Sequence, residues 1–108
     1  MIGLEELARL CPEVPPTEIT LWIERRWVRA EPGPGGGWAF TDMDVARVRL
    51  LAELRVTLEV TEEAMPLVLS LLDQLYDARR TVKALLAALE TQPEPVRAAV
   101  LAAARERG

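Results

Sequence analysis

The acidic side chains in the middle of the chain are the residues whose types and spacing most suggest chemistry. Residues 31–64 hold seven Asp and Glu side chains against three Arg. Clustered carboxylates attract a basic surface on a partner through charge complementarity. The candidate partner-binding residues are Glu59, Glu62, Glu63, Asp73 and Asp77. The alternative is that these acids favour the positive end of a helix dipole and decorate an ordinary solvated face.

The composition offers few of the residues that catalysis or metal binding requires. The chain has no histidine, and its one cysteine is Cys11, so no pair of nucleophile and base can be named. Adjacent carboxylates such as Glu62 and Glu63 share one environment and cannot take separate acid and base roles. A zinc site needs more Cys or His ligands, and the stretch Gly33–Gly37 lacks the Gly-Lys-Ser/Thr ending of a phosphate loop. We therefore expect a protein that is not an enzyme and that holds no cofactor and no metal.

The charge balance disfavours DNA as the main target. The net charge of the 108 residues is −4, whereas DNA-binding proteins need cations to displace the counterions of the phosphates. No Lys or Arg occurs between Arg29 and Arg47. The cluster of Arg25, Arg26 and Arg29 is the best counter-argument, although cations also suit the C-terminal end of a helix.

Cysteine usage and hydropathy predict a cytoplasmic location with no membrane contact. Cys11 cannot form an internal disulfide. The segment Met1–Leu10 has no apolar run of the kind found in signal peptides, and stretches such as Pro66–Leu72 are too short to cross a bilayer.

The elements that must position these residues begin with two short helices. Apolar spacing predicts a helix over Leu4–Leu10 and, after a proline-rich break, a second helix from Pro16 or Thr17. The residues that this second helix is expected to place inwards are Ile19, Trp22, Ile23 and Trp27. Two short helices with a tight connection form the frame of a helix-turn-helix.

A small hairpin, or wing, is expected next. The stretch Ala30–Gly37 is rich in Gly and Pro, and its flanks Trp27–Arg29 and Trp38–Phe40 could pair as two strands. The N-terminal part of the chain is small and holds three tryptophans. We therefore expect Trp22 and Trp38 to pack against each other between the second helix and the wing.

A third helix is predicted by a capping box. Thr41 is followed three residues later by Asp44, and the apolar spacing then continues to about Arg55. Its expected buried stripe consists of Val45, Val48, Leu51 and either Ala52 or Leu54.

The longest element is a helix over roughly Glu63–Glu90, or from Met65, because Pro66 fits only in a first turn. Apolar residues recur on it at heptad spacing, which is typical of helices that pair. We therefore expect an antiparallel homodimer whose seam consists of Val68, Leu71, Leu72, Leu75, Ala78, Val82, Leu85, Leu86 and Leu89.

The predicted organisation is a winged helix-turn-helix head over residues 1–60, a long coiled-coil helix over 61–92, and an Ala-rich tail over 93–108. A short helix could form in this tail from about Pro95.

Several segments resemble a known family. The run Trp38–Asp42, the run Val48–Arg55 and the run Leu69–Leu75 are similar to the CbpM chaperone modulators, a branch of the MerR-like superfamily. The resemblance covers about Leu4–Glu90 and implies an all-α fold, with a MerR-like winged helix-turn-helix head, a small β wing and a long C-terminal coiled-coil helix. It also implies a dimer that binds a CbpA-type J-domain co-chaperone and inhibits its action with Hsp70, by covering the Hsp70-facing surface. That surface is basic in the related families, which would suit the acids named above. The alternative functions are a MerR-type DNA-binding transcriptional regulator and an assembly adaptor with a different partner.

Overall fold

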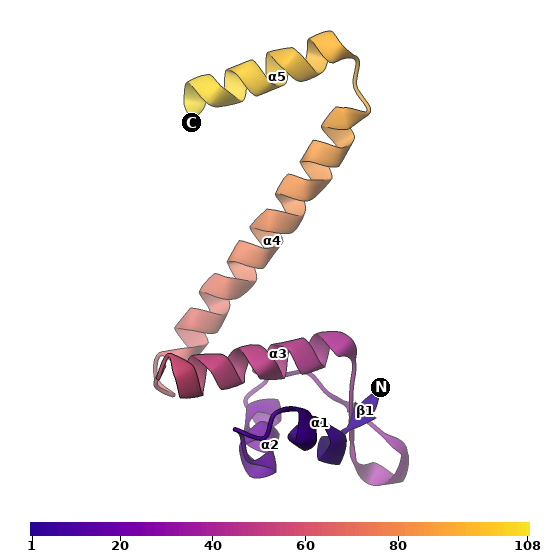
Figure 1. Cartoon of the computed structure of the whole chain (residues 1–108), viewed down its shortest axis with the longest axis vertical. Coiled ribbons are helices and arrows are strands. Elements are labelled where there is room, and N and C mark those ends of the chain that lie inside the picture. The colour runs from indigo at the N-terminus through magenta and orange to yellow at the C-terminus, as the bar shows by residue number, and fades with distance from the viewer. The chain divides into compact units, whose positions relative to one another are not determined.

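Helices account for most of the chain, and one small sheet accompanies them (Figure 1). The computed structural model describes all 108 residues, which divide into a head unit, Met1–Leu69, and a C-terminal unit, Ser70–Gly108. The α-helices are α1 (Leu4–Leu10), α2 (Pro16–Glu24), α3 (Asp42–Ala52), α4 (Met65–Glu90) and α5 (Glu94–Arg107). The strands are β1 (Ile2–Gly3), β2 (Glu31–Pro32) and β3 (Trp38–Phe40). The prediction of a helical protein with a small sheet and a long helix is confirmed at this level.

The first helix has the predicted bounds and the second begins at a predicted residue, for reasons visible in the backbone. The N–H of Cys11 donates to the carbonyl of Leu7 at the end of α1. Pro16 then occupies the first turn of α2, where its missing N–H costs nothing. Ile19 and Trp22 of α2 are both buried, as the apolar spacing predicted. Ile23 is only half-buried, and so is Trp27, which lies beyond the end of α2.

The sheet differs from the predicted hairpin. β3 lies between β1 and β2 and pairs antiparallel with both, so that Ala39 faces Gly3 on one side and Glu31 on the other. β1 was not predicted, because its two residues are too few to show alternation. A turn over Pro34–Gly36 connects β2 to β3.

Two expectations about the wing are wrong. Trp27–Arg29 is not a strand, because the N–H groups of Trp27 and Val28 both donate to the carbonyl of Trp22 and thereby close α2. Trp38 is not part of the core: it pairs with Pro32 near the turn and is 37% exposed. Phe40, two residues nearer α3, is buried in its place.

The capping box at the start of α3 is confirmed. The N–H of Thr41 donates to Oδ2 of Asp44 at 2.9 Å, and the N–H of Asp44 donates to Oγ1 of Thr41 at 3.2 Å. Beyond Ala52 the helix widens into a π turn over Glu53–Thr57.

An unusual backbone conformation ends this helix. The N–H of Leu58 donates to the carbonyl of Glu53, and the N–H of Val60 donates to the carbonyl of Leu54. Glu59, between them, has φ +54°, the left-handed region that favours glycine. The chain therefore stops the helix with a glutamate where glycine is the usual choice.

The core lies entirely within the head unit. Buried side chains come from α1, α2, β3, α3, the π turn, the start of α4 and the segments that connect α1, α2 and β2: they are Leu7, Cys11, Val14, Ile19, Trp22, Val28, Ala39, Phe40, Val48, Leu51, Ala52, Leu54, Met65 and Leu69. Val45, expected in the buried stripe of α3, is half-buried. α4 begins at Met65, which was one of the two predicted starts, and Pro66 lies in its first turn.

The Ala-rich tail forms the helix α5, and no residue between Ser70 and Gly108 is buried. None of the helices combines the length with the apolar character that crossing a bilayer requires.

Candidate interaction surfaces

The loop between α3 and α4 carries three of the predicted partner-binding acids, and we call residues 58–64 the acidic loop. Oγ1 of Thr61 accepts a hydrogen bond from the N–H of Ala64 at 3.2 Å, and the N–H of Met65 donates to the carbonyl of Thr61. Thr61 thus caps the start of α4. Glu62 and Glu63 follow it directly, where the positive end of a helix dipole stabilises carboxylates. Their location by itself fits either interpretation of these acids.

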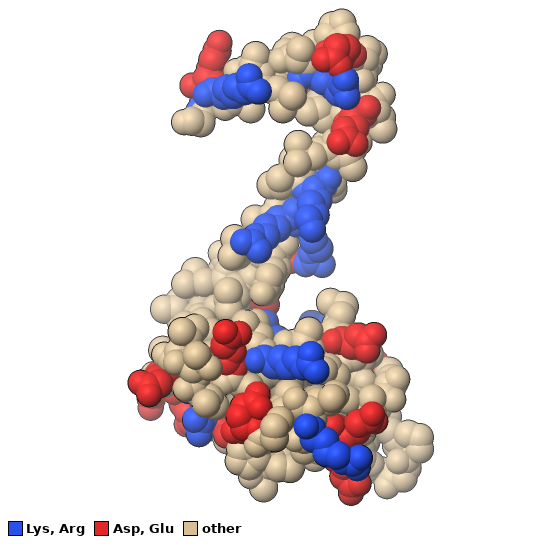
Figure 2. Space-filling view, viewed as in Figure 1, with Lys and Arg blue, Asp and Glu red and all other residues tan.

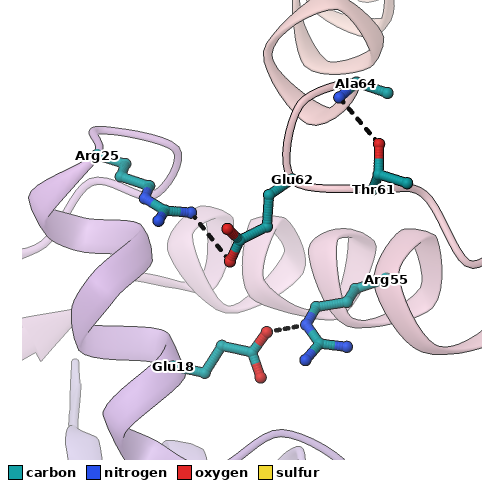
Figure 3. Close-up of polar contacts among 6 residues, drawn as sticks. All are labelled: Glu18, Arg25, Arg55, Thr61, Glu62 and Ala64. Atoms are coloured by element: carbon teal, nitrogen blue, oxygen red, sulfur yellow. Dashed lines mark hydrogen bonds and ion pairs between the residues drawn. The ribbon is translucent and has the colours of Figure 1, made fainter.

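Glu62 is engaged inside the head unit (Figure 3). Its Oε1 lies 3.3 Å from Nη1 of Arg25, and the guanidinium of Arg25 also lies over the ring of Trp27, 5.1 Å from its centroid. A second ion pair beside it joins Glu18 of α2 to Arg55 of the π turn. These pairs attach the acidic loop and the π turn to α2.

Glu59 and Glu63 are the acids of this loop that remain available. Both side chains are exposed, and neither makes a hydrogen bond or an ion pair within the chain. A left-handed conformation costs an ordinary L-residue roughly 1–2 kcal/mol, so the head bears this strain to hold a glutamate at position 59. The free carboxylate in this conformation makes Glu59 a candidate binding residue, while Arg26 shares the same kind of backbone conformation.

Asp73 and Asp77 belong to the other unit, on α4, and are both exposed. Asp77 forms an ion pair with Arg80 one turn later. Lys and Arg side chains gather midway along α4 (Figure 2), and the only ones in this helix are Arg79, Arg80 and Lys83. α4 therefore carries cations as well as the predicted partner-binding residues Asp73 and Asp77.

The predicted seam residues line one side of α4 and are largely uncovered. Leu71, Leu75 and Val82 are about half exposed, as are Leu85 and Leu86. Val68, Leu72 and Leu89 are partly covered, and Ala78 is exposed. Asp73 and Asp77, by the 3.6-residue repeat, lie on the side opposite Leu75. A partner helix on the seam would therefore leave both carboxylates in solvent.

The arginines that could support DNA binding are scattered or engaged. Arg25 is held by Glu62 and Trp27, whereas Arg26 and Arg29 are exposed. The hairpin from Glu31 to Phe40 contains no Lys or Arg. Acidic and basic side chains are interspersed on the face of the head that Figure 2 shows.

A shallow groove in the head was not predicted. It has a volume of about 620 Å³ and lies beside α3, with Ile2, Leu10, Val45 and Leu50 among its apolar lining residues. The charged residues along it are Asp42, Arg49 and Glu53. Heptad and period-2 patterns give no signal for such a groove, because its walls come from three separate segments.

Cys11 is fully buried in the head. Burial raises the pKa of its thiol above the ordinary value of 9.0, and the charge of Glu13 raises it further, while a hydrogen bond and the charge of Arg49 act in the opposite direction. A protonated, inaccessible thiol is a poor nucleophile and a poor metal ligand.

Comparison with family models, curated proteins and solved structures found no match to this chain.

Proposed function

We propose that this protein is a chaperone modulator of the CbpM type, with a MerR-like winged helix-turn-helix head, that acts as a homodimer in the cytoplasm. It binds the J-domain of a CbpA-type co-chaperone and inhibits its action with Hsp70 by covering the Hsp70-facing surface. No catalysis is involved, because occupation of that surface is sufficient. The acidic loop would orient the complex by charge, and apolar contacts would supply most of the affinity.

The observation that carries the proposal is the pair of free carboxylates in the acidic loop. Glu59 and Glu63 are exposed and have no partner within the chain. Glu59 lies at φ +54°, where glycine would relieve strain. Strained backbone conformations cluster at functional sites, which supports a binding role for this carboxylate.

The surface chemistry gives less support to a MerR-type DNA-binding regulator. The β2–β3 hairpin carries Glu31 and no cation, so it could contact phosphates only through its backbone. Arg25, in the best basic cluster, already pairs with Glu62. Phosphate binding would have to break this ion pair or rely on Arg26 and Arg29.

The first test is a calorimetric titration of the full chain with the J-domain of its host's co-chaperone at two salt concentrations. We expect saturable binding that weakens at the higher salt concentration, because charges at the rim of an interface are screened. Absence of binding at high protein concentration would refute the proposal, and binding to DNA fragments in place of the J-domain would establish the alternative.

The sharpest variant is Glu59→Gly, because it separates stability from binding. Glycine accepts the left-handed conformation, and its own entropic cost offsets part of the relief, so the free energy of unfolding should stay equal or rise by up to about 1 kcal/mol. Loss of a rim carboxylate should nevertheless weaken J-domain binding roughly 3- to 5-fold, equivalent to about 0.5–1 kcal/mol.

Arg26→Gly is the matched control. Arg26 is the other non-glycine residue with positive φ, at +62°, and it is also exposed. The control relieves the same kind of strain without removing an acid, so J-domain binding should be unchanged. If Glu59→Gly binds the J-domain as tightly as the unmodified chain, the acidic loop is not part of the interface.

A further inference from the structure

A small cavity in the head unit lies between α2, the π turn and the acidic loop. Its volume is about 260 Å³, below the roughly 300–1,000 Å³ of pockets that bind whole small-molecule ligands. Its lining includes the aromatic rings of Trp22 and Trp27 and the carboxylates of Glu18 and Glu62. A cavity of this size and chemistry suits a single long side chain of a partner better than a cofactor.

The chain itself shows which chemical group this cavity recognises. Nη1 of Arg25 lies 3.3 Å from Oε1 of Glu62 (Figure 3), and the same guanidinium lies over the ring of Trp27. A carboxylate attracts a cation through its charge, and the face of a tryptophan ring does so through its quadrupole. Both partners of Arg25 line the cavity, so its guanidinium occupies a cation-binding site at the edge of the cavity.

Glu18 supplies a second carboxylate to the same cavity. Its side chain is only 16% exposed, and it pairs with Nε of Arg55 through Oε1 (Figure 3). A carboxylate has two oxygens and accepts hydrogen bonds from more than one donor. The charged lining residues are Glu18, Glu62 and Arg55, two acids against one base. The cavity therefore favours a further positive charge.

We propose that this cavity binds an Arg or Lys side chain of a basic protein partner, and that Arg25 closes the site until the partner's cation replaces it. The side chain of Arg25 is 35% exposed and belongs to the C-cap residue of α2, so it can turn into solvent without moving the helix. The methylene stem of the incoming side chain would lie along the aromatic rings, with its charge beside Glu62. The site rests on the proposed function for the nature of its partner, a protein with a basic surface.

Competition with Arg25 sets the sign of the main prediction. The apparent affinity of a ligand is reduced by the fraction of molecules whose site is open. An exposed ion pair and a cation–π contact each shift such an equilibrium by a factor of roughly 2 to 5, so together they should weaken binding of an external cation about 4- to 25-fold. Removal of the Arg25 guanidinium should therefore strengthen binding. If the ion pair served only to fasten the acidic loop, its removal would leave binding unchanged.

The test is a titration of the full chain with the peptide acetyl-Gly-Arg-Gly-amide, which needs no J-domain. The indole N–H signal of Trp27 in two-dimensional NMR spectra, assigned with the variant Trp27→Phe, measures binding. A peptide with citrulline in place of arginine keeps the shape of the ligand without its charge. Arg25→Gln opens the site, and Arg26→Gln is the matched control, because Arg26 is the next residue, is exposed and loses the same charge. Glu62→Gln, added to Arg25→Gln, removes the acceptor.

We expect Arg25→Gln to bind the arginine peptide at least about 4-fold more tightly than the unmodified chain, and Arg26→Gln to bind it within about 2-fold. The double variant with Glu62→Gln should lose this gain, and the citrulline peptide should leave the Trp27 signal in place. Arginine binding that is no tighter in Arg25→Gln than in Arg26→Gln would overturn the proposal, and so would an equal response to citrulline.

Calorimetry of Arg25→Gln with the J-domain reports separately on the modulator function. J-domain binding that strengthens in this variant would support both the cation site and the modulator function. If the arginine peptide binds as expected but the J-domain binds neither chain, the cation site stands and the modulator function is refuted.

Discussion

Leu75 is the seam residue at which the dimer hypothesis makes its clearest quantitative prediction. Its side chain lies at the centre of the apolar side of α4 and is 44% exposed. Complete burial of a Leu side chain contributes roughly 1.5–3 kcal/mol, so covering the exposed part should contribute about 1 kcal/mol. A symmetric dimer contains two copies of the residue. Leu75→Ala should therefore cost about 2 kcal/mol of association free energy, equivalent to a roughly 30-fold increase in the dimer Kd.

Sedimentation equilibrium of the full chain and the variant measures this change. Alanine is the best helix former, so α4 should persist, and circular dichroism checks that it does. Asp77→Ala serves as the control, because Asp77 lies on the opposite side of α4 and its exposed ion pair with Arg80 contributes little. If Leu75→Ala dimerises within 3-fold of the unmodified chain, this side of α4 is not the seam.

Two further predictions concern the head unit. Thr41→Ala removes one half of the capping box and should lower the free energy of unfolding by about 1 kcal/mol, measured by urea denaturation; Thr41→Ser keeps the hydroxyl and should retain most of the stability. A loss in the serine variant equal to that in the alanine variant would show that the hydrogen bond to Asp44 is not the cause. Cys11 should react with Ellman's reagent at pH 7.5 only as fast as the head opens, because its thiol is buried and its pKa is raised. The folded chain holds the proton of the Cys11 thiol more tightly than the unfolded chain does. The stability that this proton contributes is therefore complete below pH 9.0 and is lost as the pH rises through the raised pKa. Urea midpoints measured from pH 8 to 10.5 would contradict this if they fell no faster than those of Cys11→Ala.

Local patterns predicted elements whose causes are local. The capping box fixed the start of α3, because Thr41 and Asp44 satisfy each other's backbone N–H groups within four residues. Prolines fixed the starts of α2 and α4 in the same way. Each of these features depends on residues only a few positions apart in the sequence. Patterns over such short distances can be recognised without knowledge of the tertiary structure.

The errors occur where a hydrogen-bonding partner that the local pattern does not reveal decides the structure. Trp27–Arg29 has the alternation of a strand, but the N–H groups of Trp27 and Val28 close α2 and are not available to a sheet. Trp38 is apolar and was therefore expected in the core, yet the register of β3 with β2 places it beside Pro32 near the turn. β1 forms a strand because it pairs with β3, which lies far from it in the sequence.

The candidate sites likewise depend partly on the sequence alone and partly on the tertiary structure. Composition and spacing alone determined that the chain is acidic, has no histidine, and carries an apolar stripe on a long helix. Only the tertiary structure decided which of the five predicted acids are free, since Arg25 reaches Glu62 from 37 positions away. It also decided that Glu59 carries backbone strain and that most seam side chains, such as Leu75, stay about half exposed. The physical reason is that periodicity depends on neighbouring residues along the helix, whereas charge pairing and burial depend on which distant segments the fold brings into contact.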